Sequence, residues 1–111
     1  MHVIERAIEY YHTADGEAPF REWLDSLKDA KAQQIVDARL ARLRSGLLGD
    51  CASVGNGVFE LRIHIGGGYR IYFGQVGHKV VLLLWGGLKK SQSSDIEKAK
   101  TYWNDYRKMI K

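Results

Sequence analysis

The chain has 111 residues, of which 45% are hydrophobic, one is proline and one is cysteine. This composition excludes a disordered chain, and the lone cysteine excludes an internal disulfide. No apolar run approaches the roughly 20 residues that span a bilayer, and the first residues lack the apolar segment of a secretion signal. We therefore expect one cytoplasmic domain over residues 1–111.

The net charge of +4 is unevenly distributed along the chain. Residues 1–50 carry 7 Lys/Arg and 9 Asp/Glu, whereas residues 51–111 carry 10 Lys/Arg and 4 Asp/Glu. The basic second half is what a surface that binds phosphate requires, although a soluble protein with a basic surface has the same balance.

The first half predicts one strand and two helices. Residues 2–11 are largely apolar, a pattern that fits either a strand or a short helix. We expect a strand, because the loop-like run 13–16 follows. Pro19 suits the first turn of a helix. Asp29 suits the N-cap of a second helix, and Gly46 suits its end. The apolar positions of the two helices are Phe20, Trp23, Leu24 and Leu27, then Val36, Leu40, Leu43 and Leu47.

The middle of the chain predicts three neighbouring strands. Residues 48–58 are interpreted as a loop that contains a tight turn at 55–57. Residues 59–65 alternate apolar and polar side chains, as in a strand with one buried face, and 69–73 continue that alternation. Residues 80–85 are apolar throughout, which is typical of a strand covered on both faces.

The run Gly66–Gly68 separates the first two of these strands. A loop of these three residues sets Ile65 opposite Tyr69 and Ile63 opposite Ile71, which keeps the apolar side chains on one face. The third strand runs back beside the second, so its exit lies near the polar face. The polar face then carries Glu60, Arg62, His64, Arg70 and Tyr72, with Lys89, Lys90 and Gln92 emerging close by.

The last segment predicts an amphipathic helix. Ser94 and Glu97 have the spacing of a capping box, with Ser94 as the N-cap. The predicted fold class is α+β, with a small antiparallel β-sheet and two N-terminal helices and a C-terminal helix packed on it. The apolar stripe of the last helix is Ile96, Ala99, Trp103, Tyr106 and Ile110.

The candidate chemistry lies in the cationic cluster. The four histidines lack paired ligand spacing, and Gly66–Gly68 lies in a hairpin, so we expect neither a metal nor a nucleotide cofactor. RNA phosphodiester cleavage needs a base, an acid and positive charge over the transition state, and arginine can hold two phosphate oxygens. In the structural alternative Glu60 simply pairs with Arg62, and Arg70 covers the sheet edge.

Five runs of sequence carry a family resemblance. They are PFREWLDSL, VGNGVFELRI, GGGYRIYF, VVLLLWGGLKKSQ and DIEKA, in that order. Together they resemble the RelE/ParE superfamily of toxins, and in particular its HigB-like "addiction module killer protein" branch, over about residues 3–107. The resemblance implies a compact antiparallel sheet covered by helices and a toxin of a type II toxin–antitoxin pair.

The resemblance leaves two activities open. Many members of that superfamily cleave mRNA in the ribosomal A site, whereas the ParE branch inhibits DNA gyrase without catalysis. The implied partner is a small helix-turn-helix antitoxin, and operator DNA would be bound only through the complex with that antitoxin. No membrane partner is implied.

The resemblance also assigns residues to the site. Arg70 matches the arginine of a Gly-Tyr-Arg motif, Arg62 a basic residue on the preceding strand, and Lys90 a basic residue after the last strand. The chain departs from the pattern at Glu60, where a lysine is expected, and at Ile96, where a tyrosine is expected. The candidate catalytic residues are therefore Arg62, Arg70, Lys90, His64 and Tyr72. The candidates for RNA or phosphate binding are Lys89, Gln92 and Glu60. For proton transfer the alternatives are Glu60, His64 and Tyr72.

Overall fold

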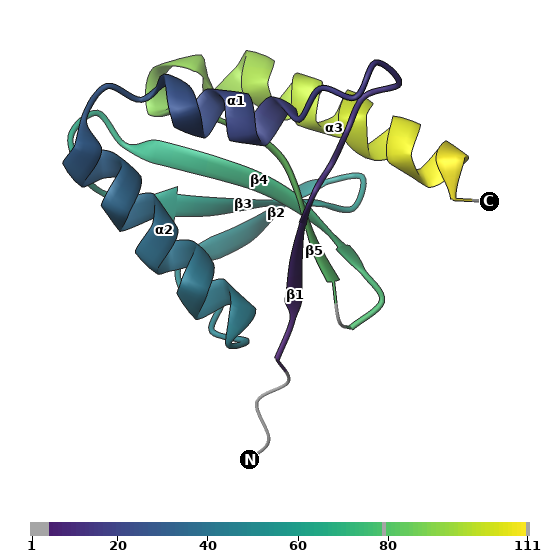
Figure 1. Cartoon of the computed structure of the whole chain (residues 1–111), viewed down its shortest axis with the longest axis horizontal. Helices are drawn as coiled ribbons and strands as arrows, with labels where there is room; N and C mark the ends of the chain where they lie inside the picture. Colours follow the sequence, from purple (N-terminus) through teal and green to yellow (C-terminus); the bar gives the residue numbers. More distant parts are fainter. Residues whose placement is uncertain (1–4, 79, 111) are drawn as a thin grey trace.

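A computed structural model describes residues 5–78 and 80–110, and its strands form one five-stranded sheet in the order β1-β5-β4-β3-β2 (Figure 1). The α+β class predicted from the sequence is confirmed. The strands are β1 (Ala7–Tyr10), β2 (Cys51–Gly55), β3 (Val58–Ile63), β4 (Tyr69–Val76) and β5 (Val80–Leu88), and the helices are α1 (Pro19–Ser26), α2 (Ala30–Arg44) and α3 (Gln92–Met109), with a 3₁₀ turn at Lys89–Ser91.

The sheet is mixed, where an antiparallel sheet was expected, because β1 pairs in parallel with β5. The long connection from β1 to β5 contains both α1 and α2, which gives the chain the length that a parallel pairing needs. Within the range 2–11 that was predicted as a strand, β1 covers Ala7–Tyr10. Residues 2–4 lie outside the described residues. As predicted, β5 is an interior strand.

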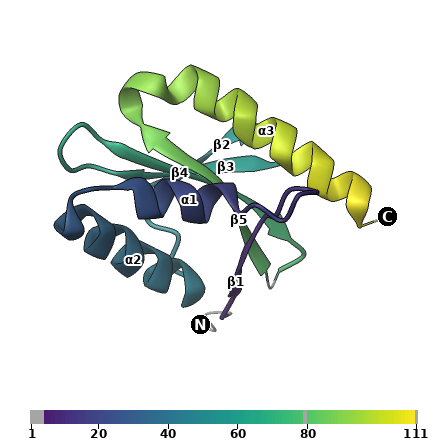
Figure 2. The same cartoon turned by 45° about the horizontal axis from the view of Figure 1, so that its top comes forward.

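Helices cover the two faces of the sheet separately, as Figure 2 shows for α2 and α3. The side chains of α1 and α2 pack on one face and those of α3 on the other, so each face has its own core. The first core includes Phe20, Leu24, Val36, Leu40, Leu43, Leu61, Ile71 and Phe73, and the second includes Tyr11, Val58, Tyr72, Leu82, Leu84, Ala99 and Trp103.

The prediction of a loop over residues 48–58 is wrong, because Cys51–Gly55 forms β2 at the edge of the sheet. The tight turn predicted there is confirmed as a hairpin between β2 and β3, with positive φ at Asn56 and Gly57. Positive φ at both central residues is what a type I′ turn requires, and that turn type matches the twist of the flanking strands.

The predicted register of β3 and β4 is wrong by two residues. Ile63 pairs with Tyr69, so residues 64–68 form a five-residue connection in place of the three-residue loop. Within it the Gly68 N–H donates to the Ile65 carbonyl at 2.8 Å. Since side chains alternate with a period of two, a shift of two preserves the faces, and Arg62 now lies opposite Arg70.

The predicted capping box at the start of the last helix is also wrong. The helix begins at Gln92, and Ser94 lies inside its first turn. Ser91 is the N-cap residue, and its hydroxyl lies 2.5 Å from the Asp95 carboxylate. That hydroxyl therefore contacts an acidic side chain of the first turn rather than a backbone N–H group.

The predicted starts of the first two helices are confirmed. Pro19 begins α1, and the Asp29 side chain caps α2 by accepting the Lys31 N–H at 2.9 Å. Two predicted apolar positions are not core positions, because Leu47 and Ile110 lie beyond the ends of α2 and α3 and are exposed. Over the described residues, no helix has the length and hydropathy that crossing a membrane requires.

Candidate functional site

The carboxylate of Glu60 lies at the centre of the polar cluster. Glu60 is on β3 and is fully buried. Its Oε1 accepts a hydrogen bond from Arg62 Nε at 3.1 Å and lies 3.6 Å from Arg70 Nη1. Its Oε2 accepts hydrogen bonds from the Tyr72 hydroxyl at 3.0 Å and from Gln92 Nε2 at 2.7 Å. A buried carboxylate needs such a set of partners to remain charged.

Arg70 enters the cluster from β4 and is buried. Its Nε and Nη1 atoms have no hydrogen-bond partner among the described residues, since the contact with Glu60 is longer than a hydrogen bond. Buried guanidinium N–H groups are normally matched by acceptors. Within the described part of the chain, Arg70 therefore holds two donors without a partner, but both are enclosed by the protein, so an anion would reach them only if the side chains around Arg70 moved.

Arg62 links the buried carboxylate to an exposed one. Its Nη1 lies 3.3 Å from Asp50 Oδ1, in addition to the bond that its Nε makes to Glu60. The hydrogen bond to Glu60 raises the pKa of Arg62, with a further contribution from both carboxylates. Arg39 of α2 donates to the Arg62 carbonyl at 3.2 Å, so α2 helps to fix this part of β3.

Asp50 also holds His64, which lies in the β3–β4 connection. His64 Nε2 is 2.5 Å from Asp50 Oδ2, and the His64 side chain is 70% exposed. The hydrogen bond from His64 and the charge of Arg62 lower the pKa of Asp50. The pair is therefore an imidazole oriented by an ionised carboxylate, with its second ring nitrogen not used by Asp50.

Tyr72 differs from His64 in its access to solvent. Tyr72 is fully buried, and burial together with the charge of Glu60 raises the pKa of its hydroxyl well above the ordinary range. Glu60 is equally buried, and both of its oxygens accept hydrogen bonds. Of the three residues considered for proton transfer, His64 has the exposed position.

The predicted convergence of the β5 exit with the polar face is confirmed. The Lys89 N–H donates to the Gly68 carbonyl at 2.9 Å, and the Gln92 side chain reaches Glu60. Lys89 and Lys90 are exposed on the 3₁₀ turn. They add positive charge at this end of the sheet, whereas Gln92 serves the buried network.

A second carboxylate, Asp95, fixes the start of α3. It is buried, and it accepts the Trp85 indole N–H at 2.8 Å as well as contacting Ser91. A Cβ atom at Gly87 would lie 1.9 Å from Asp95 Oδ2. The glycine in β5 thus permits the close approach of the first turn of α3, and the pair Gly86–Gly87 was the available sequence signal.

Metal binding and cysteine chemistry were also considered for this site. The described residues contain no group of three or more His, Cys, Asp or Glu side chains arranged to hold a metal ion. Cys51 is half-buried, and burial raises the pKa of its thiol. The thiolate form that a nucleophile requires is therefore disfavoured.

The fold and the cluster define a small α+β domain with a charged network at one end of its sheet. Arg62, Arg70, Lys89 and Lys90 oppose two carboxylates there, so the region carries net positive charge. Such a region can bind an anion and stabilise negative charge that develops on it. The exposed imidazole adds a group that can accept a proton.

No family model matches the chain. Over 81 residues it is 46% identical to a Haemophilus influenzae (strain Rd) protein described as an "Uncharacterized protein", and the match covers 73% of this chain and 82% of that protein. The chain belongs to the same family as that H. influenzae protein.

Proposed function

We propose that the protein is the toxin of a type II toxin–antitoxin pair, of the RelE/ParE kind, and cleaves mRNA on the ribosome in the cytoplasm. The observation that carries the proposal is the cationic group at one end of the sheet, in which Arg62, Lys89 and Lys90 reach solvent and the buried Arg70 adds its charge from the interior. Phosphate oxygens are natural acceptors for guanidinium and ammonium donors. Arg62, Lys89 and Lys90 add positive charge for the flanking RNA backbone.

The proposed reaction is attack of a ribose 2′-oxygen on the adjacent phosphorus. The 2′-hydroxyl proton passes to His64, and the 5′-oxygen takes a proton from water as it leaves, which yields a 2′,3′-cyclic phosphate and a 5′-hydroxyl. The hydroxide that remains takes the proton from the His64 imidazolium, so that water and the neutral imidazole are restored. Asp50 contacts Nε2 of His64, so Nδ1 is the acceptor. The Asp50 carboxylate stabilises the imidazolium that forms, and the arginines stabilise the charge on phosphorus.

Two observations favour a non-catalytic alternative, an inhibitor of DNA gyrase or another target. Glu60 places negative charge inside the cationic cluster. Ile96, at the position where the resemblance implies a tyrosine, packs against the core under α3. In this alternative the same surface binds its target without moving protons.

The proposed partner is a small antitoxin with a helix-turn-helix domain, and operator DNA would be bound through that complex. The cationic group on which the proposal rests lies at one end of a sheet rather than along a recognition helix. This placement argues against direct reading of DNA by this chain.

The test is primer extension on a reporter mRNA in a cell-free translation system, with purified protein and with or without ribosomes. We expect cuts at codon-defined positions that require translating ribosomes. His64→Gln should reduce the cleavage rate by about 10²–10⁴-fold, whereas His78→Gln, an exposed histidine in the β4–β5 turn, should leave it unchanged. Intact mRNA would transfer the assignment to gyrase, for which supercoiling assays are the measurement.

A further inference from the structure

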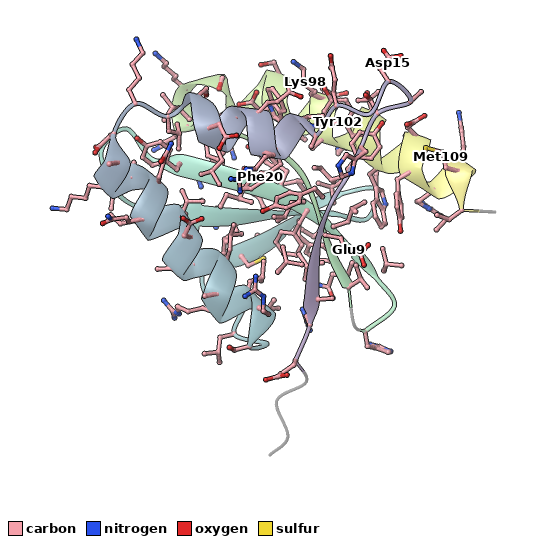
Figure 3. All side chains as sticks on the ribbon, in the orientation of Figure 1. Glu9, Asp15, Phe20, Lys98, Tyr102 and Met109 are labelled. Carbon is pink, nitrogen blue, oxygen red and sulfur yellow. The ribbon has the colours of Figure 1, made fainter. Side chains whose placement is uncertain are left out.

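A second group of side chains lies where α3 passes α1, and it shares no residue with the polar cluster around Glu60. An open groove of about 310 Å³ is lined there by Trp23 of α1, Trp85 of β5 and Tyr102 of α3, together with Glu17 and Glu22. Figure 3 shows Tyr102 at this seam between the two helices. β1 pairs with β5 as far as Leu83, so the groove lies beyond that pairing.

The aromatic walls of the groove are held in place by neighbouring atoms. The Trp23 ring packs so closely on β5 that a Cβ atom at Gly86 would lie 2.3 Å from it. Trp85 donates its indole N–H to a carboxylate of α3 at 2.8 Å. Tyr102 stacks on Tyr11 with ring centroids 5.0 Å apart and meets Trp85 edge-on at 6.2 Å. A ligand therefore meets preformed ring surfaces.

The groove is acidic in a protein whose net charge is +4. Glu17 and Glu22 are exposed, and among the described residues neither has an ion-pair partner within 4 Å. Both carboxylates line the same groove as Tyr102, and, after burial, their charges raise the pKa of Tyr102. Lys98 lies 4.4 Å from the Trp85 ring centroid without lining the groove, so that ring already attracts an ammonium group.

We propose that this groove binds a lysine or arginine side chain presented by a segment of a partner protein. Aromatic faces and carboxylates together attract a cationic group. The volume is at the lower end of the roughly 300–1,000 Å³ typical of ligand pockets, which suits one long side chain rather than the apolar face of a helix. Because the groove is open, the main chain of the partner can remain outside while its side chain enters.

The experiment is an NMR titration of the full chain with the peptide acetyl-Gly-Arg-Gly-amide, observed at the indole N–H signals. We expect saturable shifts for Trp23 and Trp85. The matched peptide, with citrulline in place of arginine, should bind with an affinity at least roughly tenfold lower. The double variant Glu17→Gln/Glu22→Gln should bind the arginine peptide roughly three- to tenfold more weakly, and Glu97→Gln, an exposed substitution on α3 outside the groove, should bind it as the parent chain does.

Three results would overturn the proposal. Equal affinity for the arginine and citrulline peptides would exclude cation recognition. An unchanged affinity in the double variant would exclude the two carboxylates. Binding of n-butylammonium as tightly as the peptide would assign the groove to a small amine rather than to a protein segment. None of these readouts depends on ribonuclease activity, so the proposed function and this site are tested separately.

Discussion

Glu60 and Asp50 both bind Arg62, yet they lie in opposite surroundings. The Glu60 side chain has no exposed surface, whereas that of Asp50 is 44% exposed. Removing a buried charge leaves its partners unmatched in a medium of low dielectric constant. An exposed charge loses far less because water replaces the partner. The same ion-pair chemistry therefore stabilises the sheet at Glu60 and orients a reactive side chain at Asp50.

The two arginines of the site also differ in burial. Arg70 is buried beside Glu60, and that carboxylate is the ion-pair partner of its guanidinium group. Arg62 is one-third exposed and contacts both carboxylates. The stability of the site thus depends on the pair Glu60–Arg70, whereas Arg62 connects that pair to His64 through Asp50.

The largest expected effect is that of Glu60→Ala on stability. This change leaves Arg70 buried without its counter-charge and removes the acceptor of the Tyr72 hydroxyl. We expect the free energy of unfolding to fall by about 3–5 kcal/mol, measured by urea denaturation with circular dichroism. Glu97→Ala, an exposed glutamate on α3, is the control, with an expected change within about 0.5 kcal/mol. If the two variants are equally stable, Glu60 does not hold the network together.

A smaller effect is expected from Tyr72→Phe, which keeps the buried ring and removes one donor to Glu60. Hydrogen bonds to charged groups contribute about 1.5–3 kcal/mol, so the free energy of unfolding should fall by an amount in that range. Tyr106→Phe is the matched control, since Tyr106 is half-buried on α3 and its hydroxyl has no hydrogen-bond partner among the described residues. Equal urea midpoints for the two variants would contradict the role given to Tyr72.

The alternation of side chains was enough to predict which residues share the polar face. Glu60, Arg62, Arg70 and Tyr72 lie on one face although the predicted register was wrong by two residues, because a shift of two preserves the face. The loop length was not predictable, since the run Gly66–Gly68 allows a turn to close at several points. His64 consequently lies in the connection rather than on the strand.

Two parts of the site did not follow from the alternation of side chains. Asp50 lies in a segment interpreted as a loop, and nothing in the alternation links it to residue 64, whose contact with it depends on the pairing of β2 with β3. The glycines at 86 and 87 were interpreted as the exit of a strand. They are inside β5, where Trp23 approaches one of them and Asp95 the other. Such approaches depend on tertiary packing, which a single sequence does not show.

The smallest expected effect on stability is that of Asp50→Asn, and it should depend on pH. The pKa of Asp50 is lowered in the folded state by His64 and Arg62, so its ionised form favours folding. That contribution is present well above the unfolded-state pKa of 3.8 and is lost as the pH falls through the lower folded-state pKa. Parent chain and variant should therefore differ slightly in urea midpoint at pH 7, and the difference should be smaller at pH 3, where part of the contribution is lost. If the difference in urea midpoint is the same at both pH values, the charge of Asp50 does not act through His64 and Arg62. The contrast between Asp50 and Glu60 would then depend on their burial alone.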